Sequence, residues 1–133
     1  MRWASMLALL MAAQDPGVEH TKDTLDMVKA KLSAKDAVLV DVREKGEWDA
    51  GHLEQAILLP LSWLKAERDG EDFARKLSDR LPQKKILYLH CRSGGRVIPA
   101  AGILRKAGYE VRPLKSGFEE LRKAGFPEAQ PEK

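Results

Sequence analysis

Four short apolar runs alternate with segments of helical periodicity along this chain of 133 residues. The runs are AVLVDV, AILLP, KILYLH and YEVRPL, at residues 37–42, 56–60, 85–90 and 109–114. Continuous apolar runs of this length are typical of strands buried on both faces of a parallel sheet. Helices are expected at residues 22–32, 44–50, 62–81 with a break near Asp69-Gly70, 95–107 and 118–124. The alternation predicts an α/β fold in which helices cover both faces of a central parallel sheet.

The chain contains a single cysteine, Cys91, and three histidines that are far apart in sequence. One cysteine cannot form an internal disulfide, and no metal-ligand spacing such as C-x-x-C or H-E-x-x-H is present. A chain of this length fits one domain that holds its core without disulfides or metal. We therefore expect neither a metal nor a cofactor, and Cys91 is either a buried thiol or a reactive one.

Charge is distributed unevenly along the chain, although the net charge is only +3. Residues 1–74 carry nine Lys or Arg against fourteen Asp or Glu, whereas residues 75–123 carry thirteen against four. Such a positive half can attract a small anionic substrate. Basic residues interleaved with exposed aromatics, or a recognisable nucleic-acid motif, are not found, so we expect no nucleic-acid partner.

The N-terminus has the outline of a signal peptide. Arg2 precedes an uncharged apolar run that ends at Ala13, and the polar residues Gln14 and Asp15 follow. The run is too short to span a bilayer, so no stable membrane span is expected. Residues 1–13 therefore predict export to the periplasm or outside the cell, with residues 14–20 as a linker. An uncleaved apolar tail or a misassigned start in a cytoplasmic protein remain alternatives.

Cys91 lies in the segment YLHCRSGGRV, between the third predicted strand and the following helix. Sites in parallel α/β sheets lie at the carboxyl ends of the strands. Gly94 and Gly95 allow a tight turn whose backbone N–H groups point inward, and the helix that follows adds the positive end of its dipole. Arg92 and Arg96 add positive charge. All of these effects favour a thiolate, which needs no separate general base, so Cys91 is predicted to be a nucleophile.

The polar residues around the other strand ends are interpreted as structural. Asp41 is expected to cap backbone N–H groups, and Arg43 is expected to pair with Glu47 across the same turn. Gly51 and His52 indicate a helix end followed by a packed imidazole. His90 precedes Cys91 on a strand, so its side chain is expected to point to the opposite face as a packed or exposed structural histidine.

Three segments together resemble the single-domain rhodaneses, a family of thiosulfate-type sulfurtransferases. CRSGGR, at residues 91–96, resembles their active-site loop C-x-x-G-x-R. DVREKGEWDAGHLEQAILLP, at residues 41–60, and SGFEELRKAGFP, at residues 116–127, are similar to the upstream and closing motifs of the family. The resemblance covers residues 21–127 in the family's order and leaves residues 128–133 as a polar tail. It implies a rhodanese-like fold whose parallel sheet has about five strands.

The resemblance also implies a chemistry for the loop. Cys91 attacks the outer sulfur of a small anionic donor such as thiosulfate, releases sulfite and carries the sulfur as a persulfide. A thiophilic acceptor, either cyanide, a thiol or a sulfur-accepting protein, then takes that sulfur in a double displacement. The backbone amides that would hold the persulfide belong to Arg92, Ser93, Gly94, Gly95, Arg96 and Val97, and the two arginines would attract the donor's oxygens.

The sequence departs from the family pattern immediately after the loop. Val97 replaces a residue that is often Ser or Ala, and Pro99 is expected to leave the Gly95 carbonyl without its intrahelical donor. Two alternatives stay open: a noncatalytic persulfide carrier that delivers sulfur to a partner, and a small phosphatase or arsenate reductase. The related phosphatases have one more residue in this loop, which argues against the second alternative. The protein is expected to be a monomer.

Overall fold

The computed structural model describes residues 17–131, so the predicted leader at residues 1–13 lies outside the described part. The strands are β1 (Ala37–Asp41), β2 (Ala56–Leu58), β3 (Ile86–His90) and β4 (Glu110–Pro113). The helices are α2 (Leu25–Ser33), α3 (Lys45–Ala50), α4 (Leu61–Glu67), α5 (Phe73–Arg80), α6 (Val97–Lys106) and α7 (Phe118–Lys123). Among these helices none has the length and apolar character needed to cross a membrane.

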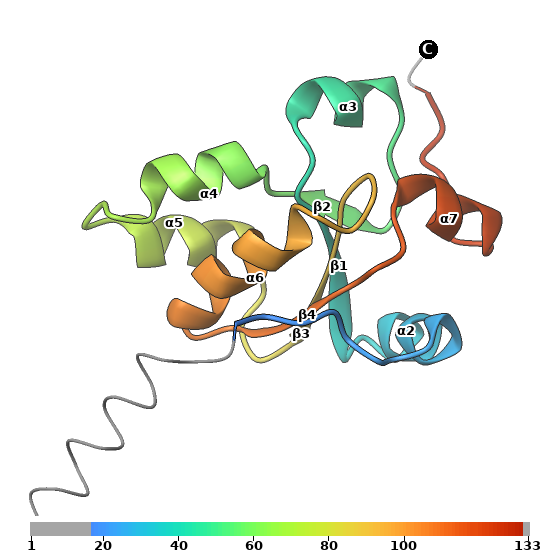
Figure 1. Cartoon of the computed structure of the whole chain (residues 1–133), viewed down its shortest axis with the longest axis horizontal. Coiled ribbons are helices and arrows are strands. Elements are labelled where there is room, and N and C mark those ends of the chain that lie inside the picture. The colour runs from blue at the N-terminus through green and yellow to red at the C-terminus, as the bar shows by residue number, and fades with distance from the viewer. Residues whose placement is uncertain (1–16, 132–133) are drawn as a thin grey trace, which may run out of the picture.

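The sheet is parallel throughout and has the strand order β2-β1-β3-β4. Asp41 pairs with both Leu58 and His90, so β1, β2 and β3 end at one edge of the sheet. The expectation of about five strands was wrong, because the described residues form four. The segment before α2 passes beside β4 but makes one backbone hydrogen bond with it, from Thr21 N to Pro113 O at 2.8 Å (Figure 1). One such bond does not make a strand ladder.

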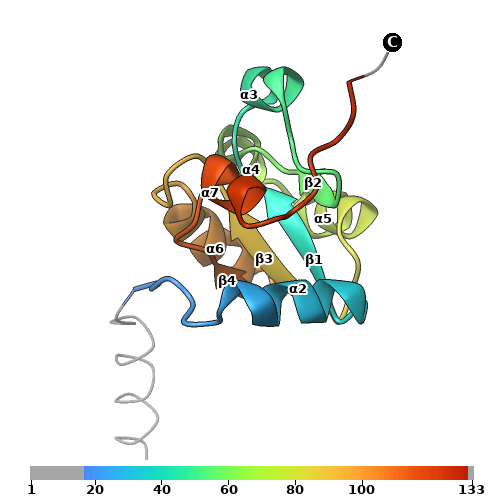
Figure 2. The ribbon, with the colours of Figure 1, turned by 90° about the vertical axis from the view of Figure 1, so that its right-hand side faces the viewer.

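Helices cover both faces of the sheet, as the alternation predicts. Helices α4, α5 and α6 lie on one face and α2 and α7 on the other, while α3 lies beyond the carboxyl ends of the strands (Figures 1 and 2). Each face has its own core cluster, and β3 contributes to both because its side chains alternate. Leu87, Leu89 and Cys91 face α6, whereas Tyr88 lies in the cluster with α2 and α7.

Helix α2 begins at Leu25, three residues later than the sequence predicts. Thr24 accepts a hydrogen bond from Met27 N at 3.2 Å and caps the helix. The chain is still extended at Thr21, because its N–H is bonded to Pro113. The predicted break near Asp69-Gly70 is confirmed, since α4 and α5 lie on either side of it.

Helix α6 begins at Val97 instead of Gly95, and this changes the effect of Pro99. Pro99 is the third residue of the helix, in the first turn, where a backbone N–H has no intrahelical partner and proline is tolerated. The expectation that the Gly95 carbonyl lacks a donor was wrong, because Ile98 N donates to it at 3.3 Å. Pro99 therefore fits the fold without opening the first turn.

Packing continues beyond residues 21–127 at both ends. Val18 lies against the core cluster on the α6 side of the sheet, and a Cβ added at Gly102 of α6 would come within 3.9 Å of it. Near the other end, Glu128 forms an isolated bridge with Leu53, and Ala129 N donates to His52 O at 2.9 Å. The segment expected to be a linker thus reaches the side of the sheet that carries α6.

Candidate active site

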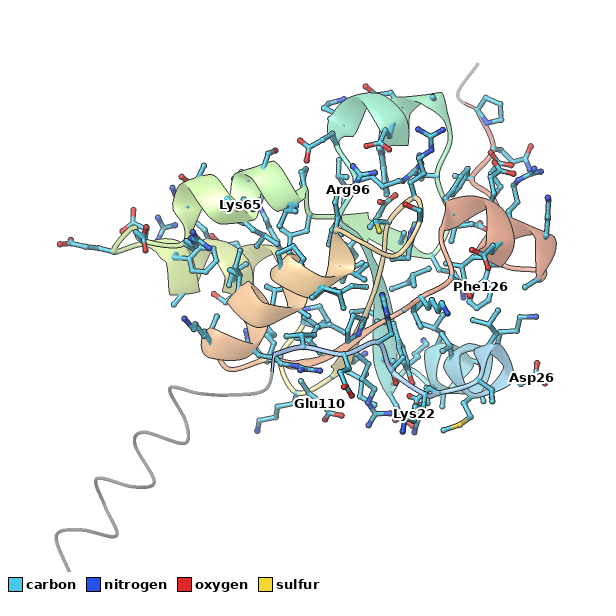
Figure 3. The ribbon with its side chains drawn as sticks, viewed as in Figure 1. Lys22, Asp26, Lys65, Arg96, Glu110 and Phe126 are labelled. Carbon is cyan, nitrogen blue, oxygen red and sulfur yellow. The ribbon has the colours of Figure 1, made fainter. Side chains whose placement is uncertain are left out.

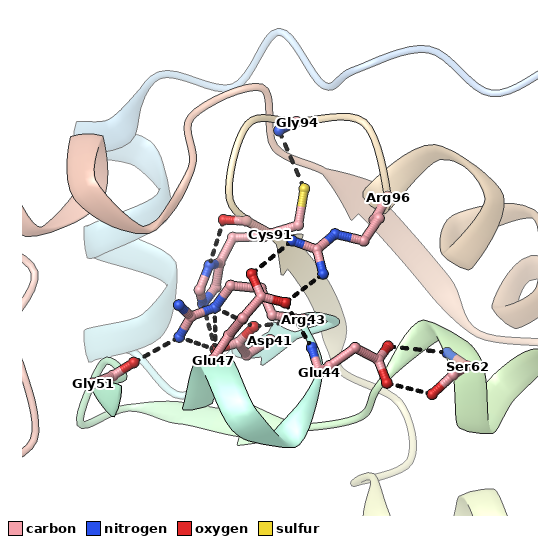
Figure 4. Close-up of polar contacts among 10 residues, drawn as sticks. Asp41, Arg43, Glu44, Glu47, Gly51, Ser62, Cys91, Gly94 and Arg96 are labelled. Carbon is pink, nitrogen blue, oxygen red and sulfur yellow. Dashed lines mark hydrogen bonds and ion pairs between the residues drawn. The ribbon is translucent and has the colours of Figure 1, made fainter. Parts of the chain in front are cut away.

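Cys91 follows β3 directly and is almost completely buried, with 1% of its surface exposed. Its Sγ accepts a hydrogen bond from Gly94 N at 3.1 Å, which is drawn in Figure 4. The amides of Arg92, Ser93, Gly95, Arg96 and Val97 donate to no acceptor among residues 17–131. Backbone N–H groups gathered in such a turn form an anion-binding concavity. The loop can therefore hold an anion at the sulfur of Cys91.

The six loop residues proposed as binding groups have different exposures. Gly94 and Val97 are buried, Arg96 is half-buried, and the other three, Arg92, Ser93 and Gly95, are exposed. Val97 packs in the same core cluster as Cys91, which fixes the end of the loop to α6. The loop thus combines a buried sulfur with an exposed rim.

Residues 115–118 support the loop from behind. Phe118 N donates to Cys91 O at 2.9 Å. A Cβ at Gly117 would lie 1.9 Å from Arg92 O, so only glycine allows this close approach. Gly94 has a φ of +88°, and a Cβ there would lie 2.7 Å from Lys115 O. The role of Gly94 is predicted from the sequence, whereas that of Gly117 is not, because its close contact is with a residue 25 positions away.

Arg96 is held by Glu47, a residue of α3. Its Nη1 and Nη2 donate to Glu47 Oε1 and Oε2 at 2.6 and 2.9 Å (Figure 4). Figure 3 places Arg96 near α3, while Glu110, the first residue of β4, lies at the opposite end of the sheet. These bonds lower the pKa of Glu47 to about 2 and raise that of Arg96. The predicted Arg43–Glu47 pair was wrong, and the charge of Arg96 at the loop is largely compensated.

Arg43 pairs with Asp41 instead. Its Nε and Nη2 bond the two carboxylate oxygens at 2.9–3.1 Å, and Nη2 also donates to Gly51 O at 2.8 Å. The predicted cap is confirmed, since Asp41 Oδ1 accepts from Arg43 N at 2.9 Å. Both side chains are buried. Their hydrogen bonds fix the turn after β1, which agrees with a structural role.

The two histidines on either side of this region are packed, as predicted. His90 is fully buried, its Nδ1 is 3.4 Å from Cys91 O, and its Nε2 is 3.7 Å from Asp41 Oδ2. Burial lowers the pKa of His90, which favours the neutral imidazole. His52 stacks on Trp48 with ring centroids 3.6 Å apart, and its Nδ1 is 3.1 Å from Trp48 O. Neither histidine is therefore placed to act as a base for the Cys91 sulfur.

His20 is a site residue that the sequence does not predict. Its Nε2 lies 2.6 Å from Gly94 O, the carbonyl of the residue whose amide bonds the Cys91 sulfur. The sequence placed His20 in a linker, and no local pattern distinguishes it there. The contact joins residues separated by 74 positions, so only the folded chain reveals it.

Comparison with known proteins agrees with this geometry. Residues 24–124 match the family described as the rhodanese-like domain. The uncharacterized protein YqhL of Bacillus subtilis is 34% identical over 98 residues, which are 73% of this chain and 70% of YqhL. The probable adenylyltransferase/sulfurtransferase MoeZ of Mycobacterium tuberculosis is 35% identical over 77 residues, which are 58% of this chain but only 18% of MoeZ.

The solved structures include a match over nearly the same length. The human single-domain sulfurtransferase TSTD1 superposes with a TM-score of 0.64 and 26% identity, over 80% of this chain and 97% of that structure. The family match covers β1 to β4 together with the Cys91 loop. The protein therefore belongs to the rhodanese-like domain family, whose members similar to it include proteins named as sulfurtransferases.

Proposed function

We propose that the protein transfers a sulfane sulfur from thiosulfate, or a related small anion, to a thiophilic acceptor through a persulfide on Cys91. The observation that carries the proposal is the arrangement around Cys91 Sγ, where Gly94 N donates at 3.1 Å and the neighbouring amides have no acceptor among the described residues. Such amides match a sulfur atom that is anionic both before and after transfer. The burial of Cys91 favours a small donor over a bulky one.

In the first half-reaction the Cys91 thiolate attacks the outer sulfur of thiosulfate. A new sulfur–sulfur bond forms, and the bond between the two thiosulfate sulfurs breaks. Its electron pair leaves with sulfite, and the transferred sulfur carries the negative charge of the persulfide. No proton moves in this step, which agrees with the absence of a base for the sulfur among the described residues around Cys91.

In the second half-reaction the acceptor attacks the outer sulfur of the persulfide. Cyanide forms a carbon–sulfur bond and leaves as thiocyanate, while a thiolate acceptor forms its own persulfide. In both cases the Cys91–sulfur bond breaks and its electron pair returns to Cys91 as the thiolate. Arg92, exposed at the rim of the loop, supplies positive charge for the anionic donor, and Arg96 is oriented by Glu47.

Intact mass spectrometry tests the proposal directly. The purified protein is incubated with thiosulfate, desalted and weighed before and after cyanide is added, with Cys91→Ser as the control. We expect only the wild type to gain one sulfur atom and to lose it to cyanide. A wild type that gains no sulfur, or a Cys91→Ser variant that still transfers it, would overturn the proposal.

Two further assays separate the alternatives. Multiple turnovers with thiosulfate and cyanide are expected of an enzyme, whereas a carrier loads once and releases sulfur only to its partner. Hydrolysis of an aryl phosphate would indicate a phosphatase instead. We expect none, because only four residues separate Cys91 and Arg96.

A further inference from the structure

We infer that His20 is a positioning residue that holds the 91–97 loop in its anion-binding geometry, an inference that rests on the proposed function. His20 Nε2 lies 2.6 Å from Gly94 O. A carbonyl oxygen can only accept a hydrogen bond, so Nε2 must carry the proton and donate it. His20 therefore restrains the backbone of the loop and does not touch the reacting sulfur.

The peptide that His20 restrains joins Gly94 to Gly95, directly after the peptide whose N–H bonds the Cys91 sulfur. The amide of Gly94 donates to Cys91 Sγ at 3.1 Å, and the carbonyl of Gly94 accepts from His20. In a trans peptide the carbonyl and the following N–H point in opposite directions. When His20 holds the Gly94 carbonyl, the amide of Gly95 is held on the opposite side. That amide has no acceptor among residues 17–131.

Two consecutive glycines make this part of the loop the easiest to deform. Glycine has more backbone freedom than any other residue, so Gly94-Gly95 depends on contacts from outside the loop. Lys115 O packs against Gly94 on one side, and His20 Nε2 would be 3.4 Å from a Cβ at the same position. Of these two neighbours, His20 is the one that bonds the loop through its side chain, from Nε2 to Gly94 O.

His20 can act as a restraint because the segment that carries it is itself fixed. Thr21 N donates to Pro113 O at 2.8 Å. Asp23 accepts hydrogen bonds from Tyr88 Oη at 2.5 Å and from Arg112 Nη1 at 2.8 Å. The bond from Tyr88, with a further contribution from Arg112, lowers the pKa of Asp23 and keeps its carboxylate charged. Figure 1 shows this segment beside β4 before it enters α2.

The first experiment compares variants that remove or keep the donor. His20→Phe and His20→Ala lack it, and His20→Gln places an amide N–H near the position of Nε2. His52→Phe is a matched control, because the His52 ring stacks on Trp48 and its Nδ1 lies against Trp48 O instead of the loop. We expect the rate of single-turnover sulfur loading from thiosulfate to fall about fivefold to tenfold in the Phe and Ala variants. The Gln variant is expected to recover to within about twofold of the wild type. His52→Phe is expected to match the wild type.

A second readout does not require sulfur transfer. Cys91 is alkylated at pH 9 with iodoacetate and with iodoacetamide, and the ratio of the two rates is compared. Both reagents consume the same thiolate, so the ratio reports how well the loop accepts an anion. We expect the ratio to fall about threefold in His20→Phe and to recover in His20→Gln.

The two experiments test the proposed sulfur transfer and the role of His20 separately. A wild type that takes no sulfur from thiosulfate overturns the proposed function, while the alkylation ratios still decide the role of His20. Equal ratios in all variants, or a Gln variant as impaired as the Phe variant, would overturn the role of His20. Thermal melting of each variant establishes that the compared proteins are folded, and His20→Ala serves where Phe disturbs the packing.

Discussion

The connections that follow β1 and β3 begin side by side at one edge of the sheet. They differ in whether their polar groups are paired within the protein. After β1, Asp41 and Arg43 are buried and satisfy each other, with further bonds to the backbone. After β3, five loop amides have no acceptor among the described residues. Unpaired N–H groups gathered in one turn can bind an anion, so the connection after β3 is the one that indicates a ligand. Polarity at a strand end is therefore not enough to identify a site.

Glu47 connects the two regions. It belongs to α3, in the connection after β1, yet both of its oxygens bind the guanidinium of Arg96 in the loop after β3. The same carboxylate accepts from Glu44 N and so completes the capping box of α3. The connection after β1 thus orients Arg96, at the end of the loop that carries Cys91.

The largest change in stability is expected when the buried pair of Asp41 and Arg43 is broken. Asp41→Asn leaves the Arg43 guanidinium buried beside a neutral amide, and we expect a loss of about 3–5 kcal/mol in the free energy of unfolding, measured by urea denaturation. Sulfur loading per folded molecule is expected to stay near that of the wild type. Lys45→Gln is the control, because its pair with Asp49 is exposed and should change stability by less than about 0.5 kcal/mol. An Asp41→Asn variant that is stable but inactive would assign Asp41 to the chemistry.

At the Cys91 loop we expect sulfur transfer to fall more than stability. Gly117→Ala forces Arg92 O away from its present position, because the added Cβ would lie 1.9 Å from it. We expect a stability loss of about 1–3 kcal/mol and a fall in sulfur loading of about 100-fold, since small misplacements of reacting groups are costly. Gly46→Ala is the control, with open space around the added Cβ. Unchanged loading in Gly117→Ala would show that the loop tolerates displacement from behind.

The sequence predicts those parts of this arrangement that are local. The apolar runs place Cys91 at the end of β3, because a strand that is buried on both faces of a parallel sheet has a continuous apolar sequence. The short turn and its glycines follow from the residues next to Cys91. The Asp41 cap is also local, since it spans two residues.

Long-range pairings could not be predicted in this way. Arg96 and Glu47 are 49 residues apart, and the nearer Arg43 was an equally reasonable partner for Glu47 on charge alone. The choice depends on where α3 lies relative to the loop. His20 likewise lies close to the loop only because Thr21 and Asp23 fix its segment beside β4.

A moderate effect is expected from removing the charge that links the two regions. Glu47→Gln keeps an acceptor for Arg96 but leaves the guanidinium charge uncompensated. For the proposed reaction we therefore expect the KM for thiosulfate to fall by about threefold at low ionic strength, as measured by steady-state kinetics. The change should shrink as salt is added. Asp49→Asn, on the same helix, is the control, and a KM that rises in Glu47→Gln would show that orientation of Arg96 outweighs its charge.

The smallest effect is the acid dependence of this same pair. The pKa of Glu47 is about 2 in the folded protein because of its bonds with Arg96, compared with 4.5 for an unperturbed glutamate. Between these values the unfolded chain binds more protons, so the stabilisation is complete above pH 4.5 and is lost as the pH falls toward 2. Both side chains are about one-third exposed, and solvent screening limits the contribution to about 0.5 kcal/mol. Urea denaturation should thus show a gap between wild type and Glu47→Gln at pH 6 that closes on acidification. Parallel curves would mean that the pair orients Arg96 without stabilising the fold, which would separate the two roles of this contact.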